Sequence, residues 1–352
     1  MRVVVTGASG NVGTSVLDAL ALDDGVQEVV GIARRRPSRA FPKTRWEAAD
    51  VQADAARLPA LFEGADAVVH LAWAIQPSRD ARELHRINVE GSRAVFDAAA
   101  QAGVGTLVHA SSIGAYSPGP KDRPVDESWP TGGVSSSFYS RHKSEAERLL
   151  DRVEAANPQL RVVRLRPGLI FKPQAAAEIR RYFAGPLLPS PLLRPAFVRV
   201  MPAMPRLVLQ AVHSDDVAEA YRLAVTDASA RGAYNVAADP VLDPSTLARE
   251  FGAVKLPLSP RLVRALADLS WRARLQPTPP GWLDMGLAVP VMDTSRLRGL
   301  GWRERWSSLQ ALRRLLEGMA RGEGLDTPPL DPDAGGPARA QELASGVGGR
   351  NP

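Results

Sequence analysis

Tyr139 and Lys143 lie four residues apart in the stretch FYSRHKSEAE, which reads as a helix, so the two side chains share one helix face. A tyrosine hydroxyl has a reference pKa of about 10, too high for efficient proton transfer near neutral pH. A neighbouring ammonium stabilises tyrosinate and lowers that pKa. The pair could therefore move a proton while a nicotinamide moves a hydride. The alternative is two solvated side chains on one helix face.

A third group is needed to hold the substrate oxygen. Ser112 ends the apolar run TLVHASS, which is predicted to be a buried strand. Ligands of open parallel sheets bind at the carboxyl ends of the strands. The sequence therefore predicts Ser112, Tyr139 and Lys143 as a catalytic set.

A glycine loop follows the first predicted strand. VVVTGASGNVG places Gly7, Gly10 and Gly13 between a strand and a helix, which is the context that dinucleotide binding requires. Gly7 permits the tight turn, Gly10 lets the backbone approach a pyrophosphate, and Gly13 lets the helix pack close to the strand. Asn11 and Val12 open the helix, whose free N–H groups and partial positive charge favour phosphate. A glycine-rich turn without a ligand is the alternative.

The residues after the second predicted strand bear on the choice of cofactor. An acidic residue there binds the ribose 2′-hydroxyl of NAD, whereas arginine accommodates the 2′-phosphate of NADP. The strand EVVGIA runs into Arg34, Arg35 and Arg36, with no Asp or Glu nearby. Arg34 and Arg35 therefore favour NADP over NAD. A solvated basic loop is the alternative.

Strands and helices alternate through the first half of the chain, which predicts a doubly wound parallel sheet of the Rossmann type in the α/β class. We expect a dinucleotide-binding domain over residues 1–172, with 205–232 returning to it. Residues 173–322 are expected to form a smaller, mostly helical C-terminal substrate lobe, in which Trp282 is interpreted as a packing residue. Residues 323–352 are rich in Gly, Pro, Ala and Asp and are expected to be a disordered tail.

At this point the chain resembles the extended short-chain dehydrogenase/reductase family, the group of NAD(P)-dependent epimerases and dehydratases that includes UDP-glucose 4-epimerase-like enzymes. The resemblance covers about residues 1–322, and its most specific parts are the glycine loop and the Tyr-x-x-x-Lys motif. Supporting stretches, in order, are AADV, VVHLAW, NVEGSRAVFDAAAQAGV, HASSIGAYS, LRPGLIF, VHSDDVAEA and GAYNVA.

The resemblance implies roles for further residues. Asp50 and Val51 would contact the adenine, Leu71 and Ala72 would line the cofactor site, and Asn88 would support the active site near the cofactor.

In the same family pattern Ser112 would polarise the substrate oxygen, and Tyr139 would be the acid/base. Lys143 would bind the nicotinamide ribose and tune Tyr139. Pro167 and Gly168 match the turn beside the nicotinamide. Trp73 stands where the family usually has a small residue, so it would narrow the substrate site.

Composition narrows the remaining possibilities. The chain has 352 residues, is 45% hydrophobic and 23% charged, and carries a net charge of +6. The arginines are scattered along the sequence and do not form the basic stripe, interleaved with aromatic residues, that is typical of nucleic-acid-binding proteins. The absence of cysteine excludes thiolate catalysis, and the five histidines show no metal-ligand spacing, so no metal is expected.

No apolar run is long enough to span a membrane, and no signal sequence is recognisable. We therefore expect a cytoplasmic protein with a small-molecule substrate and no nucleic-acid or membrane partner. Because the family often dimerises through two long helices, the resemblance leaves a homodimer open.

Three functions stay open. The first is an epimerase or dehydratase acting on a nucleotide sugar or similar hydroxylated substrate. The second is an NADPH-dependent carbonyl reductase acting on a less polar ketone. The third is a non-catalytic nucleotide-sensing protein, against which the intact Ser112, Tyr139 and Lys143 set argues.

Overall fold

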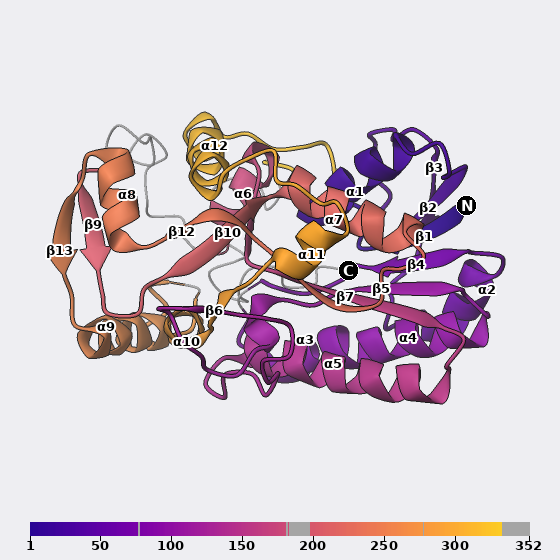
Figure 1. Cartoon of the computed structure of the whole chain (residues 1–352), viewed down its shortest axis with the longest axis horizontal. Helices are drawn as coiled ribbons and strands as arrows, with labels where there is room; N and C mark the ends of the chain where they lie inside the picture. The colour runs from indigo at the N-terminus through magenta and orange to yellow at the C-terminus, as the bar shows by residue number, and fades with distance from the viewer. Residues whose placement is uncertain (77, 181, 183–197, 277, 333–352) are drawn as a thin grey trace.

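A seven-stranded parallel sheet forms the centre of the computed structural model, which describes residues 1–76, 78–180, 182, 198–276 and 278–332. Its strand order is β11-β7-β5-β4-β1-β2-β3 (Figure 1). The strands are β1 (Arg2–Thr6), β2 (Glu28–Ala33), β3 (Thr44–Ala48), β4 (Ala67–His70), β5 (Thr106–Ala110), β7 (Arg161–Pro167) and β11 (Gly232–Val236). The predicted Rossmann-type doubly wound sheet is therefore confirmed.

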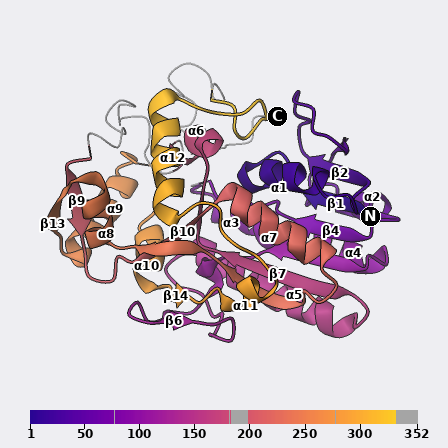
Figure 2. The ribbon, with the colours of Figure 1, turned by 45° about the horizontal axis from the view of Figure 1, so that its top comes forward.

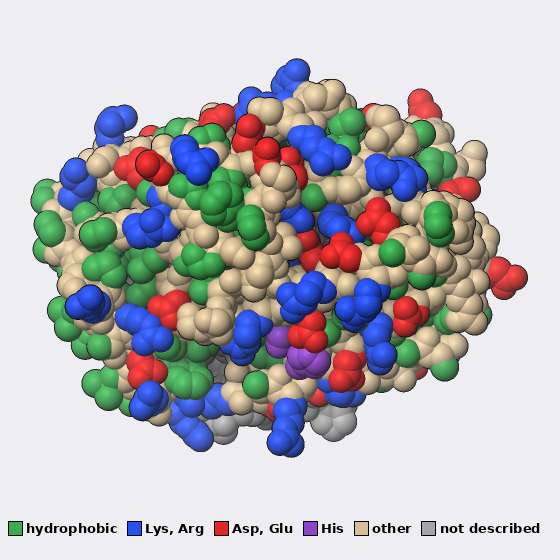
Figure 3. All heavy atoms as spheres, turned by 60° about the horizontal axis from the view of Figure 1, so that its bottom comes forward, with side chains coloured by type: hydrophobic (Ala, Val, Ile, Leu, Met, Phe, Trp, Pro, Cys, Tyr) green, Lys and Arg blue, Asp and Glu red, His purple; other side chains and the backbone are tan. Residues whose placement is uncertain are grey.

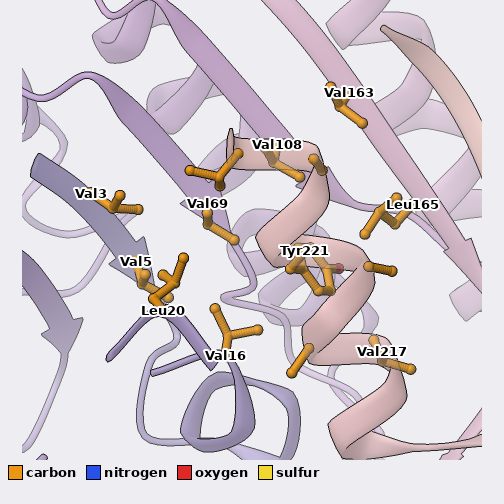
Figure 4. Close-up of a cluster of buried hydrophobic side chains, with 14 of the residues drawn as sticks. Val3, Val5, Val16, Leu20, Val69, Val108, Val163, Leu165, Val217 and Tyr221 are labelled. Atoms are coloured by element: carbon orange, nitrogen blue, oxygen red, sulfur yellow. The ribbon is translucent and has the colours of Figure 1, made fainter. Parts of the chain in front are cut away.

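Helices cover both faces of this sheet, which explains why its central strands read as continuous apolar runs. On one face lie α1 (Asn11–Ala21) and α7 (Ser214–Thr226), visible together in Figure 2. On the other lie α2 (Leu58–Phe62), α4 (Gly91–Gln101) and α5 (Phe138–Ala156) (Figure 1). Figure 4 shows side chains of the strands, such as Val5 and Val108, packed with Tyr221 of α7 in one apolar core.

The sheet order reverses between β1 and β4, which are neighbours although two strands separate them in sequence. Such a reversal is the place where open α/β sheets bind ligands. The glycine loop follows β1, Leu71 and Ala72 follow β4, and Ser112 follows β5. The topology therefore brings the predicted site residues to one edge of the sheet.

One long helical stretch, residues 81–101, is built from three pieces. It comprises α3 (Ala81–His85), a π-helical turn (Arg86–Glu90) and α4. The π turn contains Asn88, whose side chain is completely buried. π-Turns inside helices are frequent at functional sites.

The remaining elements form the smaller lobe. Two sets of short strands belong to it, β8 (Leu169–Phe171) with β10 (Leu209–His213) and β12 (Ala238–Leu242), and β9 (Val200–Ala203) with β13 (Val254–Pro257). A third pair, β6 (Pro124–Val125) and β14 (Val291–Met292), joins the two parts. Its helices are α6 (Ala176–Ile179), α8 (Pro244–Phe251), α9 (Pro260–Arg272), α10 (Gly281–Ala288), α11 (Ser295–Gly299) and α12 (Ser308–Arg321).

The return of the chain to the main sheet extends further than 205–232. β11 pairs with β7 and ends at Val236, and α7 packs against the main core. Trp302, which lies in the part predicted to be the lobe, is also buried in that core. β8 lies before residue 172 but belongs to the smaller sheet, and β11 lies after it but belongs to the main sheet, so the chain crosses between the two parts more than once.

The segment predicted to be a disordered tail begins with packed residues. Leu330 is completely buried, and the Thr327 hydroxyl donates a hydrogen bond of 2.9 Å to the Ser9 carbonyl of the glycine loop. For residues 323–332 the disorder prediction is therefore wrong, because one leucine and one threonine find partners that composition does not reveal. Residues 333–352 lie outside the described part of the chain.

Candidate active site

The glycine loop has the geometry that its sequence predicts. Gly7 has φ +71°, and a Cβ there would lie 2.6 Å from the Ala72 backbone nitrogen. A Cβ on Gly13 would lie 2.4 Å from the Gly7 carbonyl oxygen. Gly10 is different, because a Cβ there would have only an ordinary contact at 3.5 Å. Gly7 and Gly13 therefore serve internal packing, whereas the backbone at Gly10 is open to a ligand.

The start of α1 is held from the side of the smaller lobe. Lys172 donates a hydrogen bond of 2.7 Å from Nζ to the Asn11 carbonyl and is also bonded to Thr14. Burial lowers the pKa of Lys172 to about 8. Sequence reasoning missed this lysine, because it lies 161 residues from Asn11 in the chain.

The residues at the start of α1 fit a dinucleotide phosphate. Asn11 and Val12 are the first residues of an eleven-residue helix that has no acidic residue in its first turn. The Oδ1 atom of Asn11 is buried and has no hydrogen-bond partner among the described residues. Free helix N–H groups, an open Gly10 and an unpartnered polar atom are what a bound phosphate group would complete.

The residues expected near the adenosine lie at the ends of β2 and β3. Arg34 and Arg35 are exposed, and neither has an ion-pair partner among the described residues. Asp50 accepts hydrogen bonds from the backbone of Gln52 and Ala53, so its carboxylate stabilises a turn. Val51 is buried in the core. Adenine contact by Asp50 and Val51 stays a prediction.

Asn88 fixes the loop after β4. Its amide forms two hydrogen bonds with Ala74, accepting from the backbone nitrogen at 2.7 Å and donating to the carbonyl at 3.0 Å. Ala74 directly follows Trp73, and Leu71 and Ala72 lie against Gly7. Asn88 therefore supports the site by positioning this loop.

The three predicted catalytic residues meet. The Ser112 hydroxyl lies beside the Tyr139 phenol and acts to lower its pKa. The Lys143 Nζ lies 5.8 Å from the centre of the Tyr139 ring and donates to the Ala110 carbonyl at 2.6 Å. Ser112 itself accepts a hydrogen bond from the Gly114 N–H at 3.0 Å, which fixes its hydroxyl at the end of β5.

Burial has the largest effect on the pKa values of Tyr139 and Lys143. It raises the pKa of Tyr139 to about 12, although the Ser112 hydroxyl acts in the opposite direction. Burial also lowers the pKa of Lys143 well below its usual value, while the charge of Glu147 opposes this. The lowered tyrosine pKa that an adjacent ammonium would produce is therefore not seen, because burial disfavours the charged forms of both residues.

Aromatic side chains surround Tyr139. The Trp73 ring lies 6.1 Å from the Tyr139 ring, and the Lys143 Nζ lies 3.4 Å from the centre of Trp73. Trp282 of α10 lies 4.9 Å from Tyr139 on a tilted stack. A Cβ on Gly281 would lie 2.3 Å from the Ser136 carbonyl, so the glycine permits the approach that puts Trp282 there.

Two contacts of this site were not predicted from the sequence. Trp282 packs on Tyr139, 143 positions away in the sequence, and no local signal indicates this. Glu147 is buried beside Arg166, which it binds through two hydrogen bonds of 2.8 and 2.6 Å, and it accepts a hydrogen bond from Ser111. Its position four residues after Lys143 on the same helix face could have indicated it.

Pro167, the last predicted cofactor residue, ends β7 at the same sheet edge, where Val236 of β11 is its partner. The next residue, Gly168, lies so close to β10 that a Cβ would be 2.5 Å from the Gln210 carbonyl. Contact of Pro167 with a nicotinamide stays a prediction.

The described residues contain no group of three or more His, Asp or Glu side chains placed to hold a metal ion. Among the same residues, no helix is both long enough and apolar enough to cross a lipid bilayer.

Comparison with known proteins agrees with this geometry. The sequence model of the NAD dependent epimerase/dehydratase family matches residues 3–237. The Mycobacterium tuberculosis protein Rv0501 is 29% identical over 99% of this chain and 92% of its own length. The M. tuberculosis protein Rv2047c is 29% identical over 89% of this chain, which spans only 29% of that protein. A Stigmatella aurantiaca enzyme, 4-hydroxy-2-methyl-3-oxo-4-farnesyl-3,4-dihydroquinoline-1-oxide ketoreductase, is 30% identical over 51% of this chain and 55% of its own.

Solved structures share the fold. MoeE5, determined with UDP-glucuronic acid and NAD, superposes with a TM-score of 0.67 at 20% identity and covers 92% of this chain and 100% of its own. Thermus thermophilus UDP-glucose 4-epimerase, determined with NAD, gives a TM-score of 0.66 at 23% identity. The match covers 91% of this chain and 99% of the epimerase chain. At these identities the likeness is one of fold.

Proposed function

This chain belongs to the NAD-dependent epimerase/dehydratase family, and from that premise we propose that it transfers hydride between NADP(H) and a substrate carbon whose oxygen is held by Ser112 and Tyr139. The observation that carries the proposal is that Ser112, Tyr139 and Lys143 lie together at the end of β5, with the Lys143 Nζ 5.8 Å from the centre of the Tyr139 ring. A protein that only senses a nucleotide would have no need of this set.

Each residue has a separate task in the proposed reaction. The dinucleotide, when bound, supplies or accepts the hydride. Tyr139 gives its phenolic proton to the substrate oxygen, or takes one from it in the reverse direction. Ser112 holds that oxygen beside the phenol. Lys143 places a positive group near Tyr139 when it is protonated, and Arg34 and Arg35 hold the 2′-phosphate that distinguishes NADP from NAD.

We further propose a less polar ketone as the substrate, reduced by NADPH. Trp73, Trp282 and Met285 lie around Tyr139 and Gly114, so apolar surface borders the proton donor. A Tyr139 pKa of about 12 keeps the phenol protonated at neutral pH, which suits donation to a carbonyl oxygen. The likeness to a ketoreductase of a farnesylated quinoline supports the same class.

A nucleotide sugar is the second candidate, with epimerisation or dehydration as the reaction. It is supported by the family to which the chain belongs and by the UDP-sugar bound to its structural neighbour MoeE5. From the sequence alone this candidate ranks first. The aromatic residues around Tyr139 lead us to place the less polar ketone first, because a sugar would need more polar partners than these residues offer.

The two candidates differ in what happens to the cofactor. The purified protein should be analysed for bound dinucleotide and then assayed with NADPH against a panel of apolar ketones and UDP-sugars. Little bound dinucleotide and one NADPH consumed for each ketone reduced would support the reductase. Tightly bound dinucleotide at about one per chain, with conversion of a UDP-sugar and no net consumption, would establish the second candidate instead.

Tyr139→Phe tests the proton-transfer role common to both candidates. We expect turnover to fall about 10²–10⁴-fold, because the general acid is lost, while cofactor binding stays nearly unchanged. Lys143→Ala should weaken both turnover and cofactor binding, and so separates the two functions. Normal turnover by Tyr139→Phe on the natural substrate would rule out the proposed mechanism.

A further inference from the structure

One end of the molecule carries an unusual number of exposed apolar side chains. Seven large hydrophobic residues between positions 200 and 275 are each 50–73% exposed, whereas the rest of the described chain contains only two, Leu22 and Leu169, in that class. The seven are Val200, Val254, Leu256, Leu262, Leu266, Leu269 and Leu275, and we call them the apolar end surface. They lie on β9, β13 and α9 or just after it, at the left end of the molecule in Figures 1 and 2.

The strand part of this surface is one face of a two-stranded ribbon. β9 and β13 are parallel, with Val254 opposite Val200 and Leu256 opposite Pro202. Because side chains alternate along a strand, these apolar residues share one face. A two-stranded ribbon needs packing against another element to be stable, and α8 contacts both of these strands. The face that carries Val200, Val254 and Leu256 is nevertheless exposed.

The helical part repeats the same arrangement. Leu262, Leu266 and Leu269 of α9 follow the i, i+4, i+7 spacing of a single helix stripe. On a surface helix of a globular protein such a stripe faces the core. In α9 it faces solvent, and no residue of this helix is fully buried.

Basic residues border the apolar end surface. Residues 254–276 contain five basic side chains, all exposed, and one acidic side chain, Asp268, so the local charge is 5 − 1 = +4. Arg264 and Arg272 form ion pairs with Asp284 and Asp268. Lys255, Arg261 and Arg274 have no acidic partner within the described residues. Figure 3 shows the Lys and Arg side chains among the hydrophobic ones at this end.

We propose that the apolar end surface docks the protein on an anionic lipid bilayer. A helix with leucines on one stripe and arginines beside it matches an interfacial helix, which lies in the plane of the membrane surface without spanning it. The leucines would enter the boundary between headgroups and acyl chains, and Arg261 and Arg274 would face the lipid phosphates. Lys255 lies on the opposite face of β13 and donates a hydrogen bond to Ser245 of α8. The sequence-based expectation of no membrane partner rested on the absence of a spanning run, which does not bear on this mode.

A second copy of the chain fits the surface less well. Two copies meeting through the same surface would bring Arg261 and Arg274 of one copy close to the same arginines of the other, and like charges across an interface oppose association. Anionic lipid offers the opposite charge and an apolar layer together.

The proposal is tested by co-sedimentation of the full chain with vesicles. Vesicles of phosphatidylcholine alone and of an equimolar mixture with phosphatidylglycerol should be compared at low and high salt. We expect binding to the mixed vesicles, weaker binding at high salt, and little binding to phosphatidylcholine alone. A triple variant, Leu262→Ser, Leu266→Ser and Leu269→Ser, should lower the partition coefficient about tenfold or more.

Matched controls separate lipid binding from misfolding and self-association. The three leucines are already exposed, so the triple variant should keep the melting temperature and the oligomeric state of the native protein. Leu22→Ser, at another exposed leucine far from this surface, should leave vesicle binding unchanged. No sedimentation with the mixed vesicles, or equal sedimentation of the triple variant, would overturn the proposal. A native dimer that the triple variant converts to a monomer would instead identify a second copy as the occupant.

Discussion

Arg34 and Arg35 follow β2 as exposed side chains with no ion-pair partner among the described residues. If they hold a 2′-phosphate, replacing both by alanine removes charge-assisted hydrogen bonds worth about 1.5–3 kcal/mol each. We therefore expect the Arg34→Ala, Arg35→Ala variant to lose affinity for NADPH by at least about tenfold while binding NADH nearly as before. Equilibrium titration of both cofactors measures the difference.

Arg36 provides the matched control for this prediction. It belongs to the same exposed cluster but lies 4.0 Å from Glu47, so its charge already has a partner. Arg36→Ala should change the affinity for both cofactors little. Equal losses for NADPH and NADH in the double variant, or tighter binding of NADH by the native protein, would show that the arginines do not select the cofactor.

At the scale of single residues, the sequence predicts which candidate catalytic side chains lie together but not their environment. Tyr139 and Lys143 share a helix, and Ser112 ends a strand of the same sheet, so spacing and topology suffice to bring them together. The raised pKa of Tyr139 depends on burial by Trp73 and by Trp282, which comes from a helix of the other lobe. A contact between residues so far apart leaves no pattern in a single sequence.

Two neighbouring strands of the sheet carry a pair of buried histidines. His70 of β4 and His109 of β5 are directly opposite each other, and their rings are stacked at 5.6 Å. His70 has hydrogen-bond partners in Thr6 and Ser92, whereas neither ring nitrogen of His109 has one among the described residues. Burial lowers the pKa of His70 to about 3 and lowers the pKa of His109 well below 6.5.

These pKa shifts predict acid sensitivity. Because the folded-state pKa values lie below the unfolded value of about 6.5, the unfolded chain binds more protons as the pH falls below that value. The free energy of unfolding must therefore decrease through this pH range. His109→Leu removes one such group without losing a hydrogen bond, so we expect the pH slope just below the unfolded pKa to decrease by up to about 1.4 kcal/mol per pH unit.

Denaturant unfolding at several pH values measures that slope. His85→Leu replaces a half-exposed surface histidine in the same way, so it is the control that separates the effect of burial from the effect of losing a histidine. A slope unchanged in His109→Leu would mean that His109 is protonated in the folded chain, or that it titrates equally in both states. Either result would contradict the burial argument for this pair of strands.

The elements of the sheet could be predicted because both of its faces are covered. Runs such as RVVVT and EVVGIA are continuous apolar segments that alternate with amphipathic helices, and such a pattern has few alternatives to a parallel sheet. β9 and β13 gave no such signal. Each has only four residues, contains proline and is largely exposed, so neither burial nor periodicity marks it as a strand.

At the scale of the whole molecule, the C-terminal segment shows where composition misleads. Residues 323–332 lack a periodic apolar face, and that pattern predicted disorder. A segment can nevertheless pack through single side chains when an existing surface accepts them. Leu330 is buried, and Thr327 is hydrogen-bonded to the glycine loop, so the segment joins the end of the chain to its beginning.

This packing makes a prediction that the disordered-tail interpretation does not share. Leu330→Ala removes a completely buried side chain and should lower the free energy of unfolding by about 2–5 kcal/mol. Leu22→Ala is the matched control, since Leu22 is 86% exposed and its truncation should cost no more than about 0.5 kcal/mol. Chemical denaturation of the two variants beside the native protein compares them. If both leucines behave alike, the segment does not pack in solution, and Thr327 does not hold the glycine loop. If only Leu330→Ala is destabilised, the cofactor loop is supported by residues more than three hundred positions away in the sequence.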